Sequence, residues 1–248
     1  QHGCDWLVFQ SFCKMKEEGI RPSKVTYLCV LKGCVNLSAI SQGWFIHDQV
    51  LRNGFQSDLE IGNLLVNLYA KCGMPDAANR VFNQLPKQDI VSWGALVAGY
   101  AQVGKFSIVM HCLDEMAKKR FKPNDVIFTS IFAACSRAGS TQEAQTYFRV
   151  MVEKFGIKPK LQHYSCLIDL FGRSGQLKEA EQFFKIMPLP LDGVAWKSLL
   201  TSCKTHGSLN LGQTCFDQGV ELDPEDATNY ELLSCLYADT NVHKPEIT

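Results

Sequence analysis

Apolar residues recur at helical spacing in short segments, and turn-forming residues separate these segments. The stretch YSCLIDLFGRSG (164–175) carries apolar residues at helical spacing and ends at Gly175, a residue suited to a helix C-cap. The next stretch, LKEAEQFFKIM (177–187), has apolar residues at i, i+3, i+4 and i+7, and Pro188 then stops the helix. The pattern therefore predicts two helices joined by a tight turn.

This helical hairpin recurs along the chain. The stretch YAKCGMPDAANRVFNQLP (69–86) matches FGRSGQLKEAEQFFKIMP (171–188) at its Gly, Ala, Phe and Pro positions, 102 residues further on. GIRPSKVTYLCVLKGC (19–34) and RFKPNDVIFTSIFAAC (120–135) are 101 residues apart, and IVSWGALVAGY (90–100) and GVAWKSLLTSC (193–203) are 103 apart. Three independent pairs thus give one period near 102, which contains three shorter and unequal units.

Each unit ends at the polar residue that follows its turn. The expected units are a partial one at 1–23, complete ones at 24–58, 59–89, 90–124, 125–160, 161–192 and 193–226, and a truncated one at 227–248. A single hairpin cannot bury its apolar stripe, whereas stacked copies bury it on one another. We expect an all-α fold, a superhelical solenoid of helix-turn-helix repeats with an extended concave wall.

Small and aromatic residues recur at equivalent places in these units, which indicates packing positions. The alanines suit close helix contacts, the cysteines are eleventh in their units and behave as small buried hydrophobes, and the tryptophans are expected anchors. The set is Ala78, Ala144, Ala180, Cys34, Cys135, Cys203, Trp93 and Trp196.

Composition narrows the function. Lys plus Arg equals Asp plus Glu, 25 each, so nucleic-acid binding would depend on placed groups more than on bulk attraction. The eleven cysteines include no CxxC and no zinc-type cluster, which favours a reducing compartment. No apolar run approaches a membrane span, and no GxSxG, Walker A or strand-associated GxGxxG motif occurs. We expect no cofactor and no catalysis by this chain.

The chain resembles plant pentatricopeptide repeat proteins of the PLS subgroup, which are built from triplets of P, L and S units. The stretch NLLVNLYAKCGMPDAANRVFNQLPKQDIVSWGALVAGYAQVG (63–104) resembles an S-to-P junction, and ELDPEDATNYELLSCLYA (221–238) resembles the join of two E motifs. The resemblance implies a right-handed α-α superhelix. The units then read as partial P, L, S, P, L and S, followed by a first E motif, similar to tetratricopeptide hairpins, and a truncated second one.

The resemblance also implies a function. Such proteins bind single-stranded RNA in a mitochondrion or chloroplast, and most with E motifs specify cytidine-to-uridine editing sites. The deaminase of this family needs H-x-E and P-C-x-x-C, which are absent here, so an editing deaminase in trans is the expected partner. That deaminase, or proteins of the multiple organellar RNA editing factor type, would dock through the repeats and the E region.

In the family, the fifth and last residues of a unit together select one base. Carried over, Asn63 with Asp89 is the pair associated with uracil. Thr129 is a purine-type choice, although its partner Lys160 is unusual. Gly94, paired with Asn124, departs from the usual Asn or Thr, so its base is not assigned. Two further pairs are weak readers: Leu28 with Asp58 and Ser165 with Asp192. Apolar second residues of the units would sandwich the bases; these are Val25, Val91 and Val126.

Two alternatives stay open on the sequence. Ser, Asp and Asn are preferred helix N-caps, so most last residues are equally explained by capping; Lys160 alone is not. The second alternative is an α-solenoid scaffold that binds a peptide, as tetratricopeptide proteins do, without RNA specificity.

Overall fold

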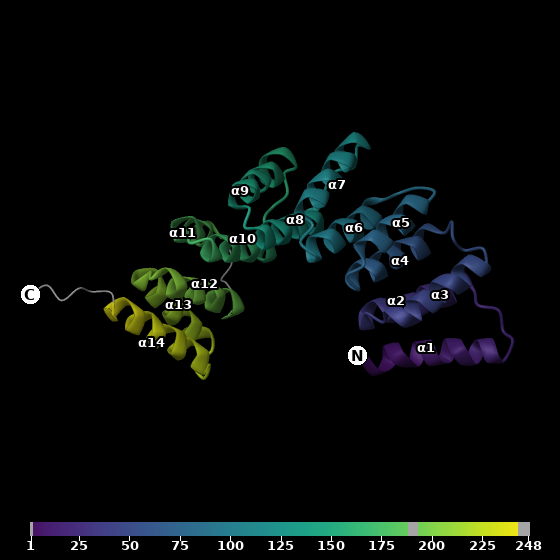
Figure 1. The fold of residues 1–248 in the computed structure, drawn as a ribbon, viewed down its shortest axis with the longest axis horizontal. Coiled ribbons are helices and arrows are strands. Elements are labelled where there is room, and N and C mark those ends of the chain that lie inside the picture. The colour runs from purple at the N-terminus through teal and green to yellow at the C-terminus, as the bar shows by residue number, and fades with distance from the viewer. Residues whose placement is uncertain (1, 188–192, 243–248) are drawn as a thin grey trace, which may run out of the picture. The chain divides into compact units, whose positions relative to one another are not determined.

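The structure, a computed structural model, describes residues 2–187 and 193–242. In these ranges the protein is all-helical (Figure 1). The helices form two compact units, an N-terminal unit (Gln1–Ala134) and a C-terminal unit (Cys135–Thr248), with the division falling inside α8. No helix within the described ranges combines the length and the apolar character that a membrane crossing requires.

The N-terminal unit is a row of antiparallel hairpins. The first helices α2, α4 and α6 lie side by side in sequence order, and each pairs with the helix that follows it. The bounds are α1 (His2–Glu17), α2 (Lys24–Leu37), α3 (Ile40–Arg52), α4 (Leu59–Lys71), α5 (Pro75–Gln84), α6 (Ile90–Gln102), α7 (Phe106–Lys118) and α8 (Asp125–Ala138).

The C-terminal unit repeats the arrangement. Helix α10 packs on α11 and α12, and α12 packs on α13 and α14. The bounds are α9 (Thr141–Arg149), a π-helical turn (Val150–Lys154), α10 (Leu161–Arg173), α11 (Leu177–Ile186), α12 (Gly193–His206), α13 (Leu209–Leu222) and α14 (Ala227–Val242). The sequence pattern did not predict the π turn, which lets one helix absorb extra residues.

Local sequence explains where the first helices begin and end. Ser23, Asp58 and Asp89 cap α2, α4 and α6, because each side chain accepts backbone N–H groups of the first turn. Gly73 and Gly175 follow α4 and α10 with φ of 72° and 73°, the left-handed conformation that turns the chain into the second helix.

The recurring residues form the core, as the sequence predicted. Ala78, Ala144 and Ala180 are fully buried, as are the three cysteines at the eleventh position. Trp93 meets Phe82 edge to face, with ring centroids 4.6 Å apart, and Trp196 meets Phe184 at the same separation. Each aromatic pair joins a second helix to the next first helix, so neighbouring hairpins share one continuous core.

Candidate nucleic-acid interface

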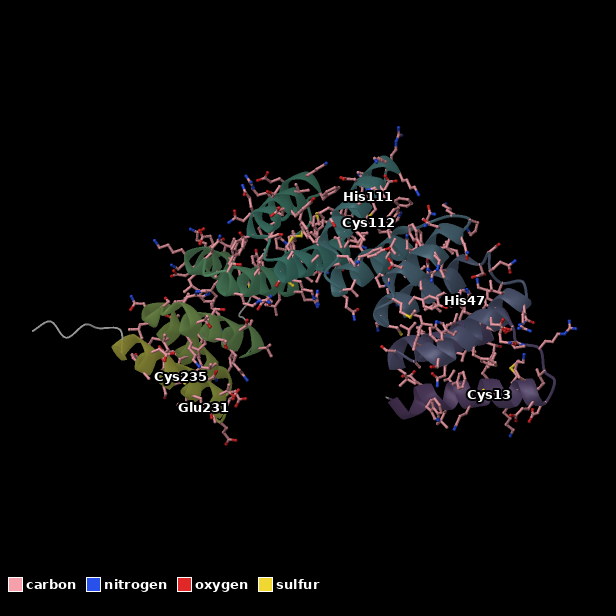
Figure 2. The ribbon with its side chains drawn as sticks, viewed as in Figure 1. Cys13, His47, His111, Cys112, Glu231 and Cys235 are labelled. Atoms are coloured by element: carbon pink, nitrogen blue, oxygen red, sulfur yellow. The ribbon has the colours of Figure 1, made fainter. Side chains whose placement is uncertain are left out.

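A groove of about 930 Å³ runs across the first helices of the N-terminal unit. It is lined by residues of α2, α4 and α6 and by the residues that open α6 and α8, while the second helices contribute none. Figure 2 labels His47 on α3 and His111 on α7, two helices outside this lining. The groove therefore runs along one helix layer, where equivalent side chains of successive hairpins meet.

The sequence-predicted pair Asn63 and Asp89 meets in this groove. The amide nitrogen of Asn63 donates to both carboxylate oxygens of Asp89, at 3.2 and 3.1 Å. The same carboxylate caps α6, because its Oδ1 accepts the backbone N–H groups of Val91 at 3.0 Å and Ser92 at 2.8 Å. Asp89 thus caps α6 and also orients Asn63, the fifth residue of its unit.

The carboxylate fixes the orientation of the Asn63 amide. A carboxylate can only accept hydrogen bonds, so the NH₂ group must face Asp89. The carbonyl oxygen Oδ1 is buried and has no hydrogen-bond partner among the described residues. A buried amide oxygen without a partner is costly, and a base that donates an N–H group to it would remove that cost.

Valine side chains stand exposed beside this polar pair. Val25, Val91 and Val126, the second residues of their units, are 66%, 59% and 59% exposed, although they line the groove. Exposed apolar surface gathered in one groove indicates a site that a ligand covers. Glu60 occupies the corresponding place on α4 and is also exposed.

The pair Gly94 and Asn124 also lines the groove, but only one of its members has a polar side chain. Asn124 caps α8, with its Oδ1 accepting the Ile127 N–H at 3.0 Å. A Cβ built on Gly94 would meet only the Ile127 side chain, at 3.8 Å. The groove is therefore open where Asn63 stands in the preceding unit.

Leu28 and Asp58 do not form an equivalent pair. Leu28 lines the groove, whereas Asp58 binds the ammonium of Lys24 at 2.9 Å, and Lys24 also reaches Glu60 at 2.6 Å. Burial raises the pKa of Asp58, but the hydrogen bond from Lys24 and those from the α4 backbone outweigh it, so the pKa lies below its usual value. The charge of Asp58 is thus already committed to a protein partner.

The remaining predicted residues use their side chains locally or lie outside the described part. The hydroxyl groups of Thr129 and Ser165 each donate to the carbonyl oxygen four residues earlier, both at 3.0 Å. Lys160 is exposed immediately before α10, and its backbone N–H donates to Nδ1 of the buried His163 at 3.0 Å. Asp192 lies outside the described residues.

The C-terminal unit has a smaller groove, of about 290 Å³, between α10 and α12. Asp169 lies in it and accepts hydrogen bonds from Ser136 at 3.0 Å and Ser198 at 2.9 Å, and it pairs with Arg173. Its negative charge is therefore compensated within the unit.

One ion pair in this unit was not predicted from the sequence. The ammonium of Lys197 on α12 contacts the carboxylate of Asp226, which precedes α14. Asp226 also accepts the backbone N–H of Thr228 at 3.0 Å, and the Lys197 hydrogen bond holds the pKa of Asp226 to about 2. The signal in the sequence is positional, because Lys197 is fifth and Asp226 last in the 193–226 unit.

These features define an α-solenoid of stacked helical hairpins with a groove on one helix layer. Family models match most of the hairpins: the PPR repeat family at residues 88–137, the PPR repeat at 63–90 and 163–188, and the pentatricopeptide repeat domain at 3–37 and 126–174. The chain belongs to the pentatricopeptide repeat family.

Relatives in Arabidopsis thaliana agree with this assignment. The putative pentatricopeptide repeat-containing protein At1g68930 is 39% identical over 227 residues, which are 92% of this chain and 31% of that protein. The pentatricopeptide repeat-containing protein At2g20540 is 38% identical over 228 residues, 92% of this chain and 43% of that protein. The chain therefore spans less than half the length of these relatives.

Solved structures share the fold. The pentatricopeptide repeat protein PPR10 from maize superposes with a TM-score of 0.75 and 19% identity, over 96% of this chain and 34% of that chain. PPR10 in complex with an 18-nt psaJ RNA element superposes with a TM-score of 0.64 and 17% identity, over 96% of this chain and 41% of that chain. The prediction of an all-helical stack of hairpins is confirmed.

Proposed function

We propose that this chain binds single-stranded RNA in a sequence-specific manner, with the groove over α2, α4 and α6 as the principal binding surface. The observation that carries the proposal is the Asn63–Asp89 pair, which fixes an amide in the groove and leaves its carbonyl oxygen without a partner. Family membership and the RNA complex of PPR10 support it.

The chemistry of the pair favours uracil. The Watson–Crick edge of uracil carries an N–H group between two carbonyl oxygens, and in single-stranded RNA this edge is open to a protein side chain. The N–H group can donate to Asn63 Oδ1, while the exposed side chain of Val91 covers the face of the base. The other side chains of the groove hold neighbouring nucleotides with less selectivity, since Gly94 offers no polar group.

Selection from randomised RNA tests the proposal. We expect the chain to enrich a short motif with uridine at one defined position, and Asn63→Ala to lose the preference at that position alone. Asn83→Ala is the matched control, because Asn83 is an exposed asparagine on the second helix α5. If no motif rises above background, the groove serves another ligand, and a peptide-binding scaffold becomes the better account.

We further propose that the bound RNA is an organellar transcript and that the chain specifies a site for cytidine-to-uridine editing. The resemblance to PLS units and E motifs supports this step, and relatives include a chloroplastic and a mitochondrial protein. The chemistry is proposed to come from a deaminase in trans that docks on the repeats and E region. Adding a purified editing deaminase to chain and RNA should convert a cytidine near the selected motif; conversion that is independent of the chain would refute the editing role.

A further inference from the structure

The ion pair of the last complete unit occupies the position of the Asn63–Asp89 pair. In both units the fifth residue of a first helix contacts an aspartate that directly precedes the next first helix, α6 or α14. In both, the aspartate also accepts a backbone N–H of the helix that it precedes. Helices α12 and α14 pack on each other as α4 and α6 do. The two arrangements are therefore equivalent in position, and in both the aspartate also bonds the helix that it precedes.

Two further features of the nucleotide-facing layer recur in this unit. Val194, its second residue, is 74% exposed, which is close to the exposure of the valines that line the N-terminal groove. Val194 and Lys197 lie three residues apart on α12 and thus share one helix face. Val194 also lines the α10–α12 groove, together with Ser165 and Cys166.

The two grooves use the same register. In the N-terminal groove, α4 contributes its fifth, sixth and ninth residues, which are Asn63, Leu64 and Asn67. In the C-terminal groove, α10 contributes Ser165, Cys166 and Asp169, which are again fifth, sixth and ninth. Within the C-terminal unit, the equivalent positions thus line a groove that reaches α12, the helix that carries Lys197.

From this equivalence we infer that the 193–226 unit contacts one further nucleotide of the bound RNA, with Lys197 held by Asp226 as the base-contacting group and Val194 against the base. This inference rests on the proposed RNA-binding function and extends it to a unit for which the sequence predicts only partner docking. We expect this site to contact a base and not a phosphate, since Asp226 already offsets the positive charge of Lys197 that would otherwise attract a phosphate.

The chemistry of the pair selects a different base from that of Asn63. An ammonium group only donates hydrogen bonds, so it requires acceptors on the base. Cytosine presents two adjacent acceptors, O2 and N3, whereas uracil places an N–H donor at N3. The Lys197–Asp226 pair therefore favours cytosine, whereas the carbonyl oxygen of Asn63 favours a base that donates an N–H group.

Exchange of the fifth residue tests the inference. Lys197→Asn recreates the Asn63–Asp89 chemistry against Asp226, so selection from randomised RNA should yield a motif that differs from the wild-type motif at one position, with uracil in place of cytosine. Lys197→Ala should weaken binding of the wild-type motif by about tenfold, the scale of one base contact. Lys178→Gln, at an exposed lysine on α11, should leave motif and affinity unchanged.

The outcomes separate this inference from the proposed function. If the wild type enriches a motif and Lys197→Asn enriches the same one, RNA binding stands and the inference is overturned. A uniform loss of affinity for all sequences, with a smaller salt dependence, would show a phosphate contact and would also overturn it. If Lys197→Asn changed the motif at a position where the wild type selects a base other than cytosine, the assignment of cytosine would be refuted. No enrichment by any variant would refute both proposals. Circular dichroism melting of each variant confirms that it is folded.

Discussion

Replacing Asp89 by serine separates the two roles that the structure gives this residue. The aspartate caps α6 through two backbone N–H groups and holds the Asn63 amide through both carboxylate oxygens. Serine is an equally good N-cap but has one short hydroxyl group, which cannot reach Asn63 while it caps the helix. Asp89→Ser therefore keeps the cap and loses the contact with Asn63, whereas Asp89→Ala loses both.

The two variants should differ in stability and agree in specificity. Asp89→Ala removes a cap worth about 1 kcal/mol, which lowers the melting temperature by about 2–4 °C for a chain of this size. Asp89→Ser should melt within about 1 °C of the wild type, since its cap is retained. In both, the preference for uracil over cytosine at the selected position should fall by about 10- to 100-fold, because a hydrogen bond to a charged group contributes roughly 1.5–3 kcal/mol.

Two assays measure these effects. Thermal unfolding followed by circular dichroism gives the stabilities, and titration of fluorescent oligonucleotides that carry uridine or cytidine at the selected position gives the preference. The double variant Asn63→Ala/Asp89→Ser should lose no more preference than either single variant, because the two residues act as one unit. If Asp89→Ser kept the full wild-type preference, Asp89 would be a helix cap alone and the base-selecting role would be refuted.

Three further predictions follow from packing, the open groove and burial. Gly99→Ala places a Cβ 2.7 Å from the Cβ of Ala70 and should lower the free energy of unfolding by about 1–3 kcal/mol. Gly94→Ala, whose Cβ meets only one side chain at 3.8 Å, should instead raise the free energy of unfolding by about 0.5–1 kcal/mol. Equal urea midpoints for the two variants would contradict the close approach at Gly99. Gly94→Asn should add a preference for one base at a second position of the selected motif, and an unchanged motif would show that this unit does not contact a base. Burial lowers the pKa of His47, whose Nδ1 lies 2.7 Å from the Tyr69 hydroxyl. As the pH decreases through 6.5, the ordinary pKa of histidine, the unfolded state therefore binds a proton at this residue before the folded state does. The free energy of unfolding should fall as the pH decreases through that value. Urea unfolding at pH 7.5 and 5.5 should show this loss in the wild type and a smaller loss in His47→Gln; identical losses would mean that His47 is not responsible.

The sequence predicted the helices and the core because both depend on short-range rules. Ser23, Asp58 and Asp89 cap the first turn of the helices that follow them, and glycine after a first helix permits the left-handed turn. The recurrence of Trp93 and Trp196 at equivalent places indicated buried anchors without any knowledge of their neighbours. These features are repeated in each unit, so the pattern carries the same information several times.

The site was only partly predictable, because it depends on contacts between units. Asn63 and Asp89 are 26 residues apart, and only the packing of α4 on α6 brings them together. The packing of α2 on α4 likewise lets Lys24 engage Asp58, a residue that sequence position alone had grouped with Asp89. Thr129 likewise turns its hydroxyl group to its own helix backbone, as threonine often does within a helix.

The most direct measurement of the central claim is photo-cross-linking of the selected RNA, with 4-thiouridine at the uridine position, followed by mass spectrometry of the adducts. We expect adducts on peptides from α4 and α6, which carry Asn63 and Val91, and their loss on competition with unlabelled RNA. Adducts confined to the second helices α5 and α7 would contradict the claim.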